Sequence, residues 1–128
     1  MSYIKHKAEE SVEDYLEAIL ILHNRIGRVR SIDVAKELDF SKPSVSVAMK
    51  NLRNKDYITV DSDGFISLTP TGKERAKNVF EKHTILSEWL ISLGVKRETA
   101  LEDACKMEHD LSEESFQAIK KAVLKEQA

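Results

Sequence analysis

The hydrophobic pattern of this chain changes its period near residue 57, and that change restricts the folds open to it. Before this point, apolar residues recur every three or four positions, as they do on the buried face of an amphipathic helix. Residues 57–60 and 65–68 are rich in β-branched and aromatic side chains, and Asp61–Gly64 between them has the composition of a hairpin turn. After residue 69 the helical period returns. The pattern therefore predicts helices, then one hairpin, then more helices.

Turn and cap residues divide the helical stretches. Gly27 and Gly94 are expected to end helices, and Pro43 and Pro70 suit the first turns of others. Three serines are the expected N-caps: Ser31, Ser41 and Ser112. The predicted helices cover residues 11–25, 32–38, 42–54, 70–93, 97–110 and 112–125, with residues 1–10 expected to be loose.

This order of elements predicts a mainly α protein with two parts. Residues 1–72 are expected to form a winged helix-turn-helix DNA-binding domain with a small two-stranded wing. Residues 73–128 are expected to form a linking helix and a C-terminal helical dimerisation domain. Cys105 is the only cysteine, which excludes an intrachain disulfide and suits a reducing cytoplasm. We expect no signal peptide and no membrane helix, because no apolar run approaches roughly 18 residues.

Charge is distributed unevenly, although the net charge is only −2. Residues 41–57 carry a local excess of three positive charges, and Arg25, Arg28 and Arg30 form a second basic cluster. From residue 85 onward, nine acidic residues outnumber six basic ones. A basic region within an otherwise acidic chain is typical of a nucleic-acid contact. The first part of the chain is therefore expected to bind double-stranded DNA.

The helix predicted at residues 42–54 has the pattern of a recognition helix. Val45, Ala48 and Met49 are expected to be buried, which leaves hydroxyl, lysine and valine side chains on the opposite face for bases and phosphates. The predicted DNA-binding residues are Arg30, Ser31, Lys42, Ser44, Ser46, Val47 and Lys50. The alternative is a helical bundle with a solvated Ser/Lys face. The hairpin after this helix favours DNA binding.

A second pattern joins Cys105, Glu108 and His109, whose spacings of three and four place them on one helical face. Thiolate, carboxylate and imidazole are ligands for divalent transition metals. The alternative is a small core cysteine beside a surface Glu–His pair.

Two further sets of candidate metal ligands also have simple structural explanations. Asp14 and Glu17 can be an acidic pair favoured by the helix dipole, and His83 can be a half-buried histidine. Nothing in the sequence spacing indicates that these three sets of residues lie close together in space.

The chain resembles the diphtheria toxin repressor family of metal-dependent transcriptional regulators, especially its short manganese-transport-regulator branch. The stretches that carry the resemblance span almost the whole chain, in the family's order and spacing. They are residues 12–19 (VEDYLEAI), 41–46 (SKPSVS), 68–73 (LTPTGK), 82–83 (KH) and 104–112 (ACKMEHDLS).

The resemblance implies a homodimer that binds metal between its DNA-binding and dimerisation parts. The implied ligands are Asp14, Glu17, His83, Cys105, Glu108 and His109. Cys105 matches the iron-responsive branch and Asp14 the manganese branch, so the site is a hybrid. Ser87 and Leu101 replace ligands of the family's ancillary metal site, and no SH3-like third domain is expected.

The function implied by the resemblance is repression of metal-uptake genes through a palindromic operator, with Fe²⁺ or Mn²⁺ as corepressor. One alternative is a winged-helix regulator whose DNA binding does not depend on metal. Another is a winged helix that serves as a protein-interaction module. An enzyme with Cys105 as nucleophile and His109 as base is not expected, because no oxyanion element or orienting group accompanies them.

Overall fold

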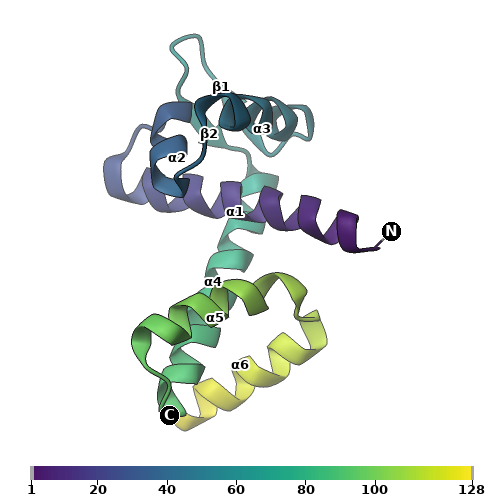
Figure 1. The fold of residues 1–128 in the computed structure, drawn as a ribbon, viewed down its shortest axis with the longest axis vertical. Coiled ribbons are helices and arrows are strands. Elements are labelled where there is room, and N and C mark those ends of the chain that lie inside the picture. The colour runs from purple at the N-terminus through teal and green to yellow at the C-terminus, as the bar shows by residue number, and fades with distance from the viewer. Residues whose placement is uncertain (1, 128) are drawn as a thin grey trace. The chain divides into compact units, whose positions relative to one another are not determined.

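The computed structural model describes the backbone of residues 2–127 and the side chains of residues 11–125. Within residues 2–127 the chain forms six helices and one antiparallel pair of short strands (Figure 1). The elements are α1 (Ser2–Ile26), α2 (Ser31–Leu38), α3 (Lys42–Asn54), β1 (Ile58–Val60), β2 (Ile66–Leu68), α4 (Pro70–Ser92), α5 (Arg97–Asp110) and α6 (Glu113–Gln127). The predicted mainly α, winged helix-turn-helix fold is confirmed. None of the described helices is long and apolar enough to cross a membrane.

The chain forms two compact units, Met1–Lys77 (unit 1) and Asn78–Ala128 (unit 2). Helix α4 begins in unit 1 and continues into unit 2. The predicted boundary between residues 72 and 73 stays a prediction, because it separates a DNA-binding region from a metal-binding and dimerisation region rather than two compact units.

Helices α1, α2 and α3 enclose one apolar core in unit 1. Leu16 and Ile19 are fully buried because residues three positions apart share a helix face. They belong to the same cluster as Val34 of α2 and Val45 of α3. Asp39 turns the chain between α2 and α3 with a left-handed φ of 56°, a conformation that Asp tolerates better than most residues do. The core therefore fixes α3 with its other face toward solvent.

Helix α3 begins as its sequence predicts. The Ser44 backbone N–H donates to Ser41 Oγ at 3.3 Å, and Pro43 lies in the first turn, where its missing N–H costs nothing. The serine hydroxyl thus satisfies an amide that has no partner within the helix.

Replacing Ser41 with Ala is expected to lower the free energy of unfolding by about 1 kcal/mol, because this amide loses its acceptor. Urea denaturation followed by circular dichroism measures the change. Ser46→Ala, at an exposed position on the same helix, is the control and should leave stability nearly unchanged. Equal losses in the two variants would contradict the capping role.

The wing is a short hairpin whose pairing is fixed by its turn. Strand β1 pairs with β2 in the register Ile58↔Leu68, Thr59↔Ser67 and Val60↔Ile66. Gly64 closes the turn with a φ of 86°, a value that suits glycine. Val29, just before α2, forms a further antiparallel bridge with Ile66. The wing is therefore joined to the chain that leads into α2.

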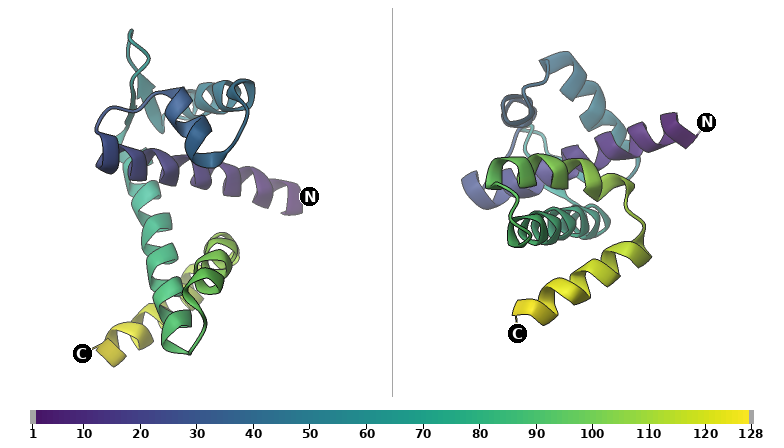
Figure 2. Two further views of the ribbon diagram at one scale, coloured as in Figure 1. Left: turned by 60° about the vertical axis from the view of Figure 1, so that its left-hand side comes forward. Right: turned by 60° about the horizontal axis from the view of Figure 1, so that its bottom comes forward.

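Unit 2 is built from the second half of α4 with α5 and α6. In the right-hand view of Figure 2, α5 and α6 lie on either side of α4. Leu86 of α4 and Phe116 of α6 are buried. Two ion pairs also join α4 to α6, Lys82–Glu113 at 3.5 Å and Lys120–Glu81 at 2.9 Å. Surface pairs of this kind contribute little, so burial of the apolar side chains holds the unit together.

Two helix starts differ from the prediction. Helix α1 begins at Ser2 and not at Ser11, because residues 2–10 contain no Gly or Pro and include strong helix formers. Helix α2 has Arg30 in its N-cap position, where Ser31 was expected. The Arg30 backbone N–H donates to Asp33 Oδ2 at 2.9 Å, so an acidic side chain inside the first turn organises this helix start.

Candidate functional site

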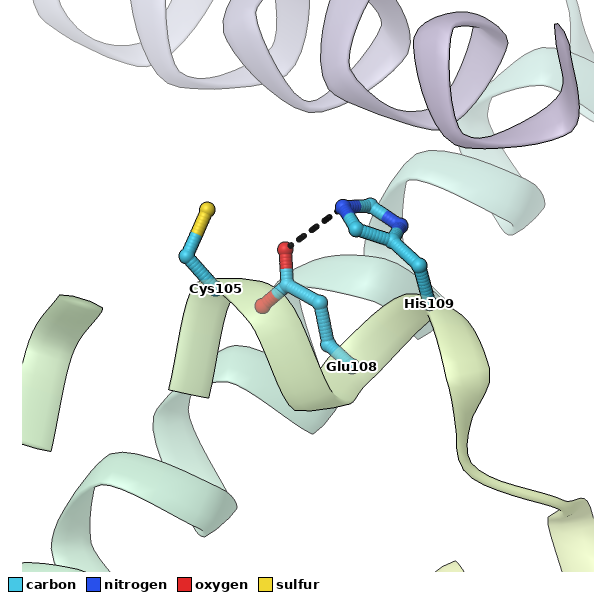
Figure 3. A group of neighbouring side chains, drawn as sticks. All are labelled: Cys105, Glu108 and His109. Carbon is cyan, nitrogen blue, oxygen red and sulfur yellow. Dashed lines mark ion pairs between the residues drawn. The ribbon is translucent and has the colours of Figure 1, made fainter. Parts of the chain in front are cut away.

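Helix α5 presents three metal-binding types of side chain side by side (Figure 3). One donor atom each from Cys105, Glu108 and His109 lies within 4.8 Å of the other two. Two donors that share an ion at about 2.0–2.3 Å lie at most about 4.6 Å apart. The three donor atoms are therefore near enough to be candidate ligands of one ion after side-chain rotation. The helical spacing predicted from the sequence accounts for this cluster.

Helix α4 places a second imidazole against the same carboxylate. His83 Nδ1 lies 2.9 Å from Glu108 Oε2, and Glu108 Oε1 lies 3.4 Å from His109 Nε2. The side chain of Glu108 has no exposed area, whereas those of His109 and His83 are 2% and 27% exposed. A carboxylate removed from water needs compensating charge or hydrogen bonds. Helices α4 and α5 thus place two imidazole rings against one buried carboxylate.

The donor chemistry fits a first-row divalent metal. Carboxylate and imidazole suit Mn²⁺ and Fe²⁺, and a thiolate favours Fe²⁺, Co²⁺ or Zn²⁺. Cys105 is exposed and carries no disulfide, so its sulfur is available as a ligand. The negative charge of Glu108 and of a Cys105 thiolate would be offset by a cation bound at the cluster on α5.

Asp14 and Glu17, the other two predicted ligands, lie on α1 in unit 1. They are one turn apart and both half-buried. Between them, Tyr15 is buried beside Phe40, with ring centroids 5.9 Å apart. Burial, helped by the Asp14 carboxylate, raises the pKa of the Tyr15 phenol. The structure thus describes this acidic pair within its own unit, on a helix face that borders the core.

The two positions expected to lack ancillary ligands have ordinary structural roles. Ser87 is buried, and its hydroxyl donates to the Thr84 carbonyl at 3.0 Å. Leu101 is half-buried and offers no donor atom. The absence of an iron-type ancillary site stays a prediction.

The solvent face of α3 carries the side chains predicted to contact DNA. Val45 and Met49 are buried as predicted, while Ala48 is half-buried. Five predicted residues of the opposite face are exposed: Lys42, Ser44, Ser46, Val47 and Lys50. Val47 is 61% exposed, and an apolar side chain so open to water suits contact with a thymine methyl group.

Two shallow hollows lie beside this face, and both are lined by Ser31 and Ser46. One, of about 200 Å³, also contacts Lys42, and the other, of about 170 Å³, contacts Lys50 and Arg53. Arg53 was not among the residues predicted from the sequence. The spacing that could have identified Arg53 is its position one helical turn after Lys50, on the same face of α3. Arg30, the remaining predicted residue, is exposed at the start of α2.

Taken together, the fold and these side chains define a winged-helix DNA-binding protein whose second unit carries a cluster of metal-binding donors. Two family models agree. "Iron dependent repressor, N-terminal DNA binding domain" matches residues 7–64, and "Iron dependent repressor, metal binding and dimerisation domain" matches residues 69–125. The chain belongs to the iron dependent repressor family, a family of DNA-binding transcriptional regulators. The resemblance drawn from the sequence motifs is confirmed.

Similar proteins include manganese and iron regulators. The transcriptional regulator MntR of Salmonella typhimurium is 36% identical over 109 residues, which are 85% of this chain and 69% of that protein. The manganese regulator SloR has a structure with a TM-score of 0.78 and 26% identity, covering 88% of this chain and 53% of its own. For T. acidophilum IdeR the TM-score is 0.70 and the identity 28%, with coverages of 86% and 52%. The chain thus spans about half the length of these two solved structures.

Proposed function

We propose that this protein is a homodimeric, metal-dependent transcriptional repressor of metal-uptake genes, with Fe²⁺ or Mn²⁺ as its corepressor. The observation that carries the proposal is the convergence of a thiol, a carboxylate and an imidazole on α5, with the imidazole of His83 against the same carboxylate. In unit 1 of the same chain, the second helix of the helix-turn-helix, α3, exposes lysine and hydroxyl side chains. One chain therefore contains a candidate metal-sensing site and a candidate DNA-recognition helix, α3.

The proposed metal ligands are His83, Cys105, Glu108 and His109 of unit 2 with Asp14 and Glu17 of unit 1. The distances within unit 2 support the first four. The resemblance to the family supports the last two. Most of these donors are acidic or neutral, so the set favours a bound cation over any other occupant.

The proposed DNA contacts are Arg30, Ser31, Lys42, Ser44, Ser46, Val47 and Lys50. The exposure of all of them except the half-buried Ser31 supports this role, and Ser31, Ser46, Lys42 and Lys50 also line the two hollows. Lysines neutralise phosphates, while hydroxyl and valine side chains meet base edges.

Packing within unit 1 supports mechanical coupling between α1, which carries two of the proposed metal ligands, and the recognition helix α3. Leu16 and Ile19 lie on the same helix as Asp14 and Glu17, and they share a core with Val45 of α3. A close-packed core transmits displacement, so a force on α1 also acts on α3. In the proposed homodimer, two copies of α3 bind half-sites one helical turn apart. Holding them at that spacing removes a conformational cost from DNA binding.

We expect Mn²⁺ or Fe²⁺ to raise operator affinity about 10- to 100-fold, the usual range for coupling between two sites. Duplexes selected from a random-sequence library by the metal-loaded protein serve as operator probes. Gel shifts then give the apparent Kd with Mn²⁺, with Fe²⁺ under anaerobic conditions, and with a chelator. Mg²⁺ is the control cation, since its preference for oxygen ligands suits this donor set poorly.

Each of the other possible results would support a different function for this protein. Equal affinity with metal and with chelator would mean a winged-helix regulator whose DNA binding does not depend on metal. Weak binding without sequence preference, even with metal, would mean a protein-interaction module. A response to Mn²⁺ alone or Fe²⁺ alone would identify the physiological metal.

The proposed function places the protein with DNA in the cytoplasm and includes no catalysis. Cys105 and His109 act in it as metal ligands and not as nucleophile and base. The family, whose members are DNA-binding transcriptional regulators, supports this assignment.

A further inference from the structure

Two arginines contact one aromatic ring, that of Phe65, where the turn of the wing meets β2. The Arg28 guanidinium carbon lies 4.2 Å from the centroid of the Phe65 ring, and that of Arg30 lies 4.3 Å from it. Both distances are well within the range of about 6 Å over which a cation is attracted to a ring face. One ring thus holds two positive charges close together, although like charges repel.

The backbone explains why these three side chains meet. Val29 bridges Ile66 in antiparallel fashion, and the Ile66 N–H donates to the Val29 carbonyl at 2.7 Å. Val29 and Ile66 are both buried. Because successive side chains along extended backbone point to opposite faces, their neighbours Arg28, Arg30 and Phe65 share the outer face. The arginines are exposed there, and Phe65 is half-buried.

Both guanidinium groups are available for an anion. Among the described side chains neither Arg28 nor Arg30 forms an ion pair, whereas nearby Arg25 is engaged with Glu37 at 2.6 Å. Stacking on a ring occupies the flat face of a guanidinium and leaves its N–H groups free in the plane. Planar donors of this kind match the oxygens of a phosphate.

The tip of the wing has the opposite charge. Asp61 and Asp63 lie in the turn, and Asp61 Oδ1 accepts from the backbone N–H groups of Asp63 and Phe65, each at 2.9 Å. These carboxylates disfavour a phosphate at the tip. The hydrogen bond from the Phe65 N–H to Asp61 fixes the backbone of Phe65 at the end of the turn, directly before β2.

We propose that Arg28 and Arg30 together bind a backbone phosphate of DNA and that Phe65 is the positioning residue that holds both guanidinium groups in place. The inference rests on the proposed function, since the partner is duplex DNA. It adds Arg28 and Phe65 to the interface and gives Arg30 a defined role. Because a phosphate carries no sequence information, this contact strengthens binding to every duplex alike.

The test is the salt dependence of DNA binding by the full chain loaded with Mn²⁺. Each phosphate contact contributes about 0.9 to the slope of log K against log salt concentration. Arg28→Ala and Arg30→Ala are each expected to reduce that slope by about 0.9 and to weaken binding about tenfold. Phe65→Leu keeps both arginines but removes the ring face, and should reduce the slope by about 1. Phe65→Trp, which restores a ring face, should recover the wild-type slope.

Phe40→Leu is the matched control, because Phe40 is an exposed phenylalanine of the same unit that packs against Tyr15 and not against an arginine. It should leave the slope unchanged. A wild-type slope in folded Arg28→Ala or Phe65→Leu protein, with Mn²⁺-dependent binding intact, would overturn the phosphate site alone. Loss of all metal-dependent DNA binding in the wild type would instead contradict the proposed function. Unfolding curves for each variant separate a lost contact from a lost fold.

Discussion

Replacing Glu108 with Gln is expected to weaken Mn²⁺ binding by more than about 100-fold and to leave operator affinity at its chelator value. Changes around a metal ligand typically cost about 10- to 100-fold in affinity, and this one removes the ligand's charge itself. The Glu108 side chain has no exposed area and faces both His83 and His109. Glutamine keeps the size of the side chain and one acceptor oxygen for His83, so the fold should survive the change. Titration calorimetry with Mn²⁺ and gel shifts measure the two effects.

Glu102→Gln is the matched control, because it makes the same change at an exposed position on the same helix. It should bind Mn²⁺ and the operator as the wild type does. Wild-type Mn²⁺ affinity in folded Glu108→Gln protein would show that the buried carboxylate is not a ligand. The cluster on α5 would then have only a structural role.

Replacing Gly72 with Ala is expected to lower the free energy of unfolding of unit 1 by about 3 kcal/mol, the upper end of the usual cost of overpacking. A Cβ at this position would overlap the Tyr57 carbonyl oxygen and lie 2.9 Å from its carbon. The obstruction is backbone, so no side-chain rotation relieves it. That carbonyl also accepts from the Thr69 N–H at 3.0 Å. The substitution therefore pushes the start of α4 away from the wing.

Chemical denaturation followed by circular dichroism measures this loss. Lys73→Ala changes the next, exposed position of α4 and should leave stability within about 0.5 kcal/mol of the wild type. An equally small effect for Gly72→Ala would mean that α4 does not depend on its close contact with Tyr57.

Local sequence patterns were enough to predict most of the fold. The Ser41 cap, the hairpin turn ending at Gly64 and the helix stop at Gly94 each depend on one or two residues with strong backbone preferences. The predicted starts of α1 and α2 were wrong for different reasons. Good helix formers upstream of Ser11 extend α1 to Ser2, whereas in α2 the Asp33 carboxylate caps the Arg30 N–H, so that Ser31 is already helical.

The candidate metal site was only partly accessible to sequence reasoning. Cys105, Glu108 and His109 follow from helical spacing within α5. The contact of His83 with Glu108 joins residues 25 positions apart, and it depends on how α4 packs against α5, which no local pattern encodes. The sequence placed Arg28 in a basic cluster but did not predict it as a DNA contact, because its proposed phosphate contact depends on the bridge between Val29 and Ile66. Long-range pairing of this kind requires the folded structure.

The exposed position of Cys105 bears on how such regulators diverge. The other donors on α5 are almost fully enclosed, so exchanging them disturbs packing as well as chemistry. In the proposed site, a substitution at position 105 would change the hardness of the ligand set with little effect on stability. A single codon would then be enough to alter metal preference among descendants of one gene, while the DNA-contacting residues proposed for α3 are encoded elsewhere and would be inherited unchanged.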